Sequence, residues 1–182
     1  KSHGLESDAV LLGADVSGLA DTLAGQGAAT VYLCDDTSLE IFNTEQYTAL
    51  VTDALKQSGA TQVWLTSSEL GRDLTPRIAA RQGVGALSDV TKLELNGDEI
   101  TAYRPCMATK AIQKCKFSKG GLRVISIRSG IYPADEPSPA SADTVSLSIP
   151  SGNSQLNVRE VQVEESNEVE LNDASIIVSA GR

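Results

Sequence analysis

Charged side chains that could do chemistry are concentrated between Ser67 and Gly83, a segment that contains Arg72, Asp73 and Arg77. The apolar run Val63-Trp64-Leu65 precedes this segment, and a second apolar run follows it. The pattern predicts a buried strand, a turn that carries the first charged residues, a helix and another strand. In parallel α/β proteins, ligands bind at such a turn, and the free N–H groups of the helix favour anions.

The turn is predicted at Gly71-Arg72-Asp73, and the helix is predicted over 74–82. The chain contains no G-x-G-x-x-G and no G-x-x-x-x-G-K-S/T motif. We therefore infer that Arg72 and Asp73 fill the place where a nucleotide phosphate would approach the backbone. Two interpretations stay open. Either Asp73 caps the helix and pairs with Arg72 or Arg77, or these side chains lie at a protein interface, where arginine is enriched.

The composition is that of an aliphatic domain of ordinary size. The 182 residues are 41% hydrophobic and 4% aromatic, which suits one domain or one domain with a tail. The net charge of −9 is concentrated in residues 131–173, which hold nine acidic residues against the single basic residue Arg159. Because there is no stripe of lysine and arginine, we do not expect a nucleic-acid partner. The sequence has no run of 18 or more apolar residues, so we expect no membrane span.

Residue types used in catalysis and metal binding are scarce. The single histidine lies near the N-terminal end, so zinc sites and Ser–His or Cys–His catalysis lack their usual parts. Cys34, Cys106 and Cys115 form no C-x-x-C pair, which favours free thiols and a cytoplasmic location. Asp35 and Asp36 are a candidate carboxylate pair for an enzyme, but adjacent carboxylates after a strand are more typical of a solvated turn. We therefore predict a chain that is not an enzyme.

The first half of the chain alternates strands with helices, which predicts a parallel sheet covered on both faces. One short helix is predicted over 17–26 with Ser17 as its N-cap, and a long amphipathic helix is predicted between Asn43 and Gly59. In the second half, Asn96-Gly97 and Lys119-Gly120-Gly121 are turn signals that predict antiparallel strands. The strand-like segments are 10–12, 31–34, 63–66, 84–87, 89–95, 99–104, 111–117 and 122–128.

The composition changes after Tyr132, where proline and serine become frequent. We predict a core domain over 1–132, a weakly ordered Pro/Ser-rich connector over 133–155 and returning strands over 156–182. The last part is expected to hold an edge strand at 156–163 and a buried strand at 176–178.

Four motifs occur in a fixed order along the chain. They are Gly71-Arg72-Asp73-Leu74-Thr75-Pro76-Arg77-Ile78-Ala79-Ala80-Arg81, then Tyr103-Arg104-Pro105 with Lys110-Ala111, then Ile127-Arg128-Ser129-Gly130-Ile131-Tyr132-Pro133, and finally Leu171-Asn172-Asp173-Ala174-Ser175-Ile176-Ile177-Val178-Ser179-Ala180-Gly181-Arg182. As a set they resemble the N-terminal domain of the electron transfer flavoprotein alpha subunit. The chain departs from the usual family residues at Thr109, Ser129, Tyr132 and Ala180.

The resemblance implies a three-layer, Rossmann-like parallel sheet of the adenine-nucleotide-hydrolase-like type. It also implies a structural platform that pairs with an electron transfer flavoprotein beta subunit. In the full alpha subunit, a flavin domain that is not in this sequence carries FAD. The complex passes electrons from dehydrogenases of the acyl-CoA type, as in fatty acid oxidation, to a quinone-linked acceptor. AMP, where present, lies in the partner subunit.

By the same resemblance, Arg182 matches an arginine that contacts FAD, although this chain is not expected to hold flavin by itself. The residues expected at the partner interface or in ion pairs are Arg72, Asp73, Arg77, Arg104 and Arg128. The expected location is the cytoplasm of a bacterium or archaeon, with the mitochondrial matrix as the alternative. The alternative function is an adenine-nucleotide-binding module of the same superfamily.

The resemblance also raises a structural question at Lys1 to Gly13. Members of the family have a strand and a helix before this segment, and the first strand of a doubly wound sheet lies centrally. Without it, two neighbouring strands would have unpaired backbone groups in the core. Either further residues or another peptide is expected to fill that position, and the sequence leaves both open.

Overall fold

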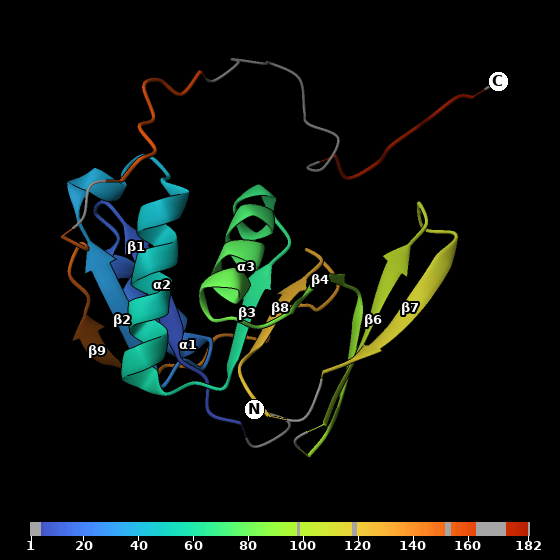
Figure 1. Ribbon diagram of the computed structural model, residues 1–182, viewed down its shortest axis with the longest axis horizontal. Helices are drawn as coiled ribbons and strands as arrows, with labels where there is room; N and C mark the ends of the chain where they lie inside the picture. Colours follow the sequence, from blue (N-terminus) through green and yellow to red (C-terminus); the bar gives the residue numbers. More distant parts are fainter. Residues whose placement is uncertain (1–4, 98, 118–119, 152–153, 163–173, 182) are drawn as a thin grey trace.

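The computed structural model describes residues 5–97, 99–117, 120–151, 154–162 and 174–181 (Figure 1). The described chain forms an α/β fold whose helices and strands alternate in its first half. The helices are α1 (Ala20–Gly25), α2 (Thr44–Ser58) and α3 (Glu69–Arg81), with 3₁₀ turns at Ser17–Leu19 and Thr37–Leu39. The strands are β1 (Ala9–Gly13), β2 (Thr30–Asp35), β3 (Gln62–Thr66), β4 (Ala86–Val90), β5 (Lys92–Asn96), β6 (Glu99–Cys106), β7 (Ala111–Lys116), β8 (Arg123–Ile127) and β9 (Asp143–Ser146).

The strands of the described residues form three separate sheets of three strands each. The first parallel sheet has the order β1-β2-β9, and the second parallel sheet has the order β3-β8-β4. The antiparallel sheet has the order β5-β6-β7, in which Asn96 pairs with Glu99 beside the predicted turn and Gly97 has φ 60°. The predicted α/β class with parallel strands and an antiparallel extension is confirmed.

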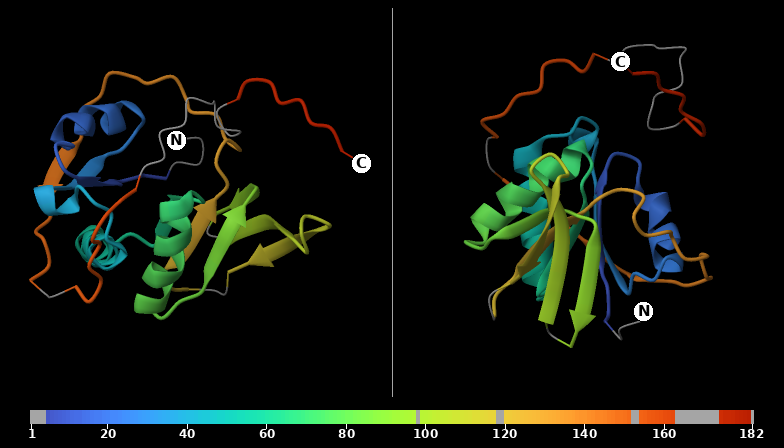
Figure 2. Two further views of the ribbon diagram at one scale, coloured as in Figure 1. Left: turned by 90° about the horizontal axis from the view of Figure 1, so that it is seen from above. Right: turned by 90° about the vertical axis from the view of Figure 1, so that its right-hand side faces the viewer.

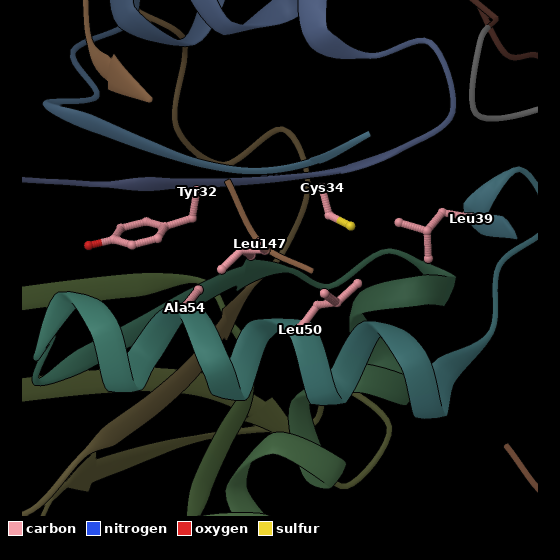
Figure 3. Packing of buried hydrophobic residues seen from close by; sticks show 6 residues of the cluster. All are labelled: Tyr32, Cys34, Leu39, Leu50, Ala54 and Leu147. Carbon is pink, nitrogen blue, oxygen red and sulfur yellow. The ribbon is translucent and has the colours of Figure 1, made fainter. Parts of the chain in front are cut away.

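The first parallel sheet is covered by α2 on one face and α1 on the other (Figures 2 and 3). Leu50 and Ala54 of α2 pack against Tyr32 and Cys34 of β2 in one buried cluster. Val51, the residue after Leu50, faces the second parallel sheet and packs with residues of α3 and β8. Helix α2 therefore bridges the two parallel sheets.

The second parallel sheet has α3 on one face and the antiparallel sheet on the other. Ile78 of α3 packs with Val124 of β8, and Ile125 of the same strand packs with Ile100 and Ala102 of β6. Segment 122–128 was expected to be one of the antiparallel strands, and this was wrong. β8 is instead the central strand of a parallel sheet, because its buried residues face apolar neighbours on both sides.

Helix α2 matches its prediction at both ends. The side chain of Asn43 accepts hydrogen bonds from the backbone of Glu45 and Gln46, and Gly59 ends the helix with φ 66°. The N-cap predicted at Ser17 is wrong. Ser17 begins a 3₁₀ turn, and its N–H donates to the carboxylate of Asp35 at 2.9 Å.

Helix α3 begins at Glu69, five residues before the predicted helix. Its N-cap is Ser68, whose hydroxyl accepts a hydrogen bond from the N–H of Gly71. The predicted turn at Gly71-Arg72-Asp73 is therefore helical, and Asp73 does not cap the helix. Pro76 lies inside the helix rather than in its first turn.

The connector predicted over 133–155 contains the strand β9, which pairs in parallel with β2 (Thr30 with Asp143). Leu147, directly after this strand, is 6% exposed and joins the core against α2. The expectation of a weakly ordered connector was therefore wrong for this part. Val145, Leu147 and Ile149 alternate with polar residues, which is the period of a half-buried strand.

The strand predicted at 156–163 is not formed over its described part, 156–162. The open edge of β2 is paired with β9 instead. Leu156 is held at the start of α2, where its N–H donates to the Glu45 carboxylate and its C=O accepts from the Asn43 side chain. The predicted buried strand 176–178 is also wrong, because Ile176 is 83% exposed and Val178 is 92% exposed. Both segments lack a strand partner among the described residues.

Candidate functional site

The carboxyl end of β3 leads into α3 through a loop of only two residues, Ser67 and Ser68. The first turn of α3 lies directly against the end of the strand at Gly71. A Cβ atom on Gly71 would lie 1.8 Å from the carbonyl oxygen of Thr66 and 3.0 Å from its carbonyl carbon. Glycine is therefore required here for a close approach of two backbones, and not for a phosphate-binding turn.

Asp89 lies beside this loop at an irregular point of β4, where the pairing with β8 shifts between Leu87 and Val90. Its φ of 59° is in the left-handed region, which aspartate tolerates better than most residues. The N–H of Asp89 donates to the hydroxyl of Ser126 at 3.2 Å. The buried hydroxyl of Ser67 donates to the same oxygen at 2.9 Å. These bonds hold the Asp89 backbone against the ends of β3 and β8.

The carboxylate of Asp89 forms a two-bond ion pair with Arg128. Arg128 Nε lies 2.9 Å from Asp89 Oδ1, and Nη2 lies 2.6 Å from Oδ2. This bidentate bond is the main cause that lowers the pKa of Asp89, and the charges of Arg128, Arg72 and Arg104 lower it further. We call Asp89 with Arg72, Arg104 and Arg128 the arginine cluster. Its residues come from α3, β4, β6 and the position directly after β8.

The arginine cluster holds three positive charges against one carboxylate. Arg128 and Asp89 are partly exposed, at 41% and 29% of their side chains, and Arg72 is exposed. The Nε atom of Arg104 is buried and has no hydrogen-bond partner among the described residues. Because the three arginines exceed the one carboxylate by two positive charges, the cluster can attract an anionic group or an acidic protein surface. It contains no nucleophile or general base arranged for catalysis.

The five residues predicted at the partner interface or in ion pairs thus divide into two groups. Arg128 binds Asp89 and the charges of Arg72 and Arg104 act on the same carboxylate, whereas Arg77 and Asp73 form a separate pair. In that pair Arg77 Nε lies 3.2 Å from Asp73 Oδ1, one helical turn along α3, and both side chains are about half exposed. Arg182, the predicted flavin contact, lies outside the described residues.

The alternative of an enzyme with paired carboxylates is not supported by the geometry of Asp35 and Asp36. Asp35 accepts the N–H of Ser17, and this bond is the main cause that lowers its pKa. Asp36 caps the next 3₁₀ turn, and its pKa is lowered chiefly by a hydrogen bond from the hydroxyl of Ser38. The two carboxylates therefore serve separate turns. Within the described part of the chain, no group of three or more His, Cys, Asp or Glu side chains could hold a metal ion.

The described residues also contain no membrane-spanning helix and no flavin site at the end of β3. None of their helices is long and apolar enough to cross a bilayer. At the end of β3 there is no room for a flavin phosphate, because the loop has two residues and α3 is packed against the strand end at Gly71.

Replacing Asp89 with asparagine is expected to lower the Tm by about 3 °C at pH 7, since the ion pair is partly exposed and therefore screened. The folded-state pKa of Asp89 is lowered, so its contribution is present above the unfolded value of about 4 and is lost as the pH falls through the lower folded value. The difference in Tm between wild type and Asp89→Asn should therefore shrink below about pH 4. Thermal unfolding from pH 7 to pH 2.5 tests this.

The control is Asp21→Asn in the exposed first turn of α1. A difference between wild type and Asp89→Asn that stays constant down to pH 2.5 would show that the carboxylate charge does not stabilise the fold.

The parallel strands, the crossover helices and the charged cluster at the strand ends define a Rossmann-like α/β domain without a glycine-rich nucleotide loop among its described residues. The family model "Electron transfer flavoprotein domain" matches residues 1–153. The chain belongs to this family.

Curated relatives agree with the family match. The chain is 27% identical to the protein FixB of Clostridium saccharobutylicum, with 98% of this chain and 54% of the relative aligned. It is 26% identical to the electron transfer flavoprotein subunit alpha of Bacillus subtilis, with 95% of this chain and 53% of the relative aligned. A third relative, the acryloyl-CoA reductase electron transfer subunit beta of Anaerotignum propionicum, is 30% identical over 59% of this chain. The chain spans about half the length of the first two relatives. The resemblance to an electron transfer flavoprotein alpha subunit is therefore confirmed for its N-terminal half.

Proposed function

We propose that this chain is the structural platform of an electron transfer flavoprotein alpha subunit, and that the full subunit pairs with a beta subunit. The alignment of two relatives named electron transfer flavoprotein subunit alpha over 95% or more of this chain supports the assignment to the alpha side. We propose that FAD binds to the part of the subunit beyond this sequence, with Arg182 as one of its contacts. AMP, if present, is placed in the beta subunit.

The arginine cluster is the observation that supports docking of this chain to the beta subunit. Arg72 is exposed, and the Asp89 carboxylate on which its charge acts is already bound by Arg128, so the positive charge of Arg72 stays available to a partner. Arginine is enriched in protein interfaces, where its planar fork binds carboxylates in two bonds. We therefore assign the cluster to the contact with an acidic surface of the beta subunit.

The electron donor is proposed to be a dehydrogenase of the acyl-CoA type, as in fatty acid oxidation, and the acceptor is proposed to be linked to a quinone. One relative is named as an electron transfer subunit of acryloyl-CoA reductase, which supports the acyl-CoA class. Another is named as a subunit of a lactate dehydrogenase that uses NAD⁺ and ferredoxin, so the electron donor differs among relatives. The proposed location is the bacterial or archaeal cytoplasm, with the mitochondrial matrix as the alternative.

Co-expression of the full-length subunit with its beta subunit tests the proposal. The expected result is a heterodimer that co-elutes with flavin absorbance near 450 nm, while residues 1–182 alone carry no flavin. AMP is then titrated into residues 1–182 and into the heterodimer. Micromolar AMP binding to residues 1–182, with no complex formed, would instead favour the alternative of an adenine-nucleotide-binding module.

A further inference from the structure

The chain that follows β9 contacts the start of α2 through a short polar segment. Ser154, Gln155 and Leu156 form hydrogen bonds there with the side chains of Asn43 and Glu45, which lie 109 to 113 residues earlier in the chain. We call these five residues the clasp. The clasp joins a segment far along the chain to a helix of the core.

Glu45 makes the strongest contact of the clasp. Its Oε2 atom accepts three hydrogen bonds, from the hydroxyl of Ser154 at 2.7 Å, from the N–H of Gln155 at 2.8 Å and from the N–H of Leu156 at 3.4 Å. Donors that converge on one oxygen in this way are typical of a backbone site for an anion. They lower the pKa of Glu45, with the Ser154 hydroxyl as the main cause, so this carboxylate is charged at neutral pH.

Asn43 holds the same segment from a second side. Its Nδ2 atom donates to the carbonyl oxygen of Leu156 and to the hydroxyl of Ser154, both at 3.1 Å. Its Oδ1 atom caps α2 by accepting the N–H groups of Glu45 and Gln46. Because Asn43 already caps the helix, the carboxylate of Glu45 is not needed for that purpose, and its bonds to the segment are a separate tertiary contact.

The clasp holds the segment by hydrogen bonds and not by apolar packing. Leu156 is 42% exposed, and Ile41 beside it is 43% exposed. A cavity of about 350 Å³ lies between residues 154–158 and the start of α2, and most of its lining side chains are polar. Little apolar surface is therefore lost from burial when the segment moves away, so loss of one bonding side chain should release it without unfolding the domain.

We propose that the clasp is a releasable anchor that sets where the chain after β9 becomes free of the domain. With the clasp closed, the chain is held as far as Leu156, and residues 159–162 are exposed and lead away from the sheets (Figures 1 and 2). With the clasp open, the last contact is that of Ile149, which packs against the core. The difference is about seven residues, or up to about 25 Å of extended chain.

The clasp would therefore limit how far the following part of the subunit can move from the platform. For a flavin-binding part, this consequence rests on the proposed function, whereas the clasp itself does not. A subunit that binds no beta subunit or no flavin would contradict the proposed function and leave the test of the clasp unchanged.

Hydrogen exchange of the full-length subunit, read at single residues by mass spectrometry, tests the clasp. The amides of Gln155 and Leu156 are expected to exchange at least about 10-fold more slowly than in an unstructured peptide, and Glu45→Ala is expected to remove this protection. The matched control is Glu40→Ala, at an exposed glutamate that lines the same cavity. It should leave the protection unchanged. Unprotected amides in the wild type, or equal protection in Glu45→Ala, would overturn the proposal.

Ser154→Ala separates release of the segment from damage to α2. It removes a donor to Glu45 from the segment side and leaves the helix unchanged, so exchange of Gln155 and Leu156 should be about 3-fold faster while the amides of α2 keep their protection. If Glu45→Ala unfolds α2, this variant is the deciding one. Unchanged exchange in Ser154→Ala would then overturn the proposal.

Trypsin cleavage after Arg159 tests whether the clasp limits the freedom of the chain beyond it. Arg159 is the single basic residue of 131–173, and its cleavage requires the neighbouring chain to enter the protease in an extended form. Cleavage there is expected to be about 10-fold faster in Glu45→Ala than in the wild type or in Glu40→Ala, with cleavage after Lys56 of α2 unchanged. Equal cleavage after Arg159 in all three proteins would overturn the proposal, even if the exchange rates differ.

Discussion

The substitution Gly71→Ala is expected to destabilise the domain by about 3 kcal/mol, because it forces two backbone segments apart. The added Cβ would lie 1.8 Å from the carbonyl oxygen of Thr66, which is far inside any real carbon–oxygen contact. No side-chain rotation relieves the contact, since both atoms nearest to the Cβ belong to the Thr66 backbone. The first turn of α3 must therefore move away from β3, and the hydrogen bond from Gly71 N–H to Ser68 is strained with it. Urea unfolding followed by circular dichroism measures the effect.

The matched control is Gly85→Ala, at the glycine that precedes β4. A Cβ on Gly85 would meet no atom within 4 Å, and the backbone there has no positive φ. Its stability should change by less than about 0.5 kcal/mol, or increase slightly through reduced entropy of the unfolded chain. Equal stabilities of the two variants would contradict the close packing of α3 on the end of β3.

Local patterns in the sequence were sufficient for the long helix and for the overall class. Helix α2 has apolar residues at helical spacing, an asparagine that caps it and a glycine that ends it, and these signals act within a few residues of one another. The start of α3 was misassigned because glycine is typical of turns. The reason for Gly71 is its approach to Thr66 in β3, which is a tertiary contact that no local pattern shows.

The strand β9 was missed because its alternating residues lie in a segment rich in proline and serine. Its stability comes from the free edge of β2, more than 100 residues earlier in the chain, and from burial of Leu147 against α2. Conversely, segment 176–178 has the composition of a buried strand and is exposed, because composition predicts a tendency and not the presence of a partner.

The candidate site could be predicted only in part. Arg72, Arg104 and Arg128 were predicted as site residues because they lie in motifs that resemble one family. Asp89, the carboxylate that binds Arg128, was missed. It lies 39 residues from its partner Arg128, and a single aspartate in a strand has no periodicity or spacing that signals such a role. The pairing of Arg77 with Asp73 is local, at one helical turn, and was open to prediction for that reason.

Replacing Arg72 with alanine is expected to weaken binding of the beta subunit about 10-fold without unfolding the domain. The side chain is exposed and its guanidinium acts on Asp89 only through its charge, so the fold loses little. The charge reversal Arg72→Glu is expected to weaken binding about 100-fold, since it adds repulsion from an acidic partner surface. Arg77→Ala is the matched control, because Arg77 lies on the same helix and is already paired with Asp73.

Calorimetric titration of the full-length subunit with its beta subunit is the most direct measurement of the docking role of the arginine cluster. Wild type, Arg72→Ala, Arg72→Glu and Arg77→Ala are compared at 50 mM and 300 mM salt, after circular dichroism has shown equal folding. The expected result is a loss of affinity that grows from Arg72→Ala to Arg72→Glu and is smaller at high salt, with Arg77→Ala unchanged. Equal affinity of wild type and Arg72→Glu at low salt would contradict the assignment of this cluster to the partner contact.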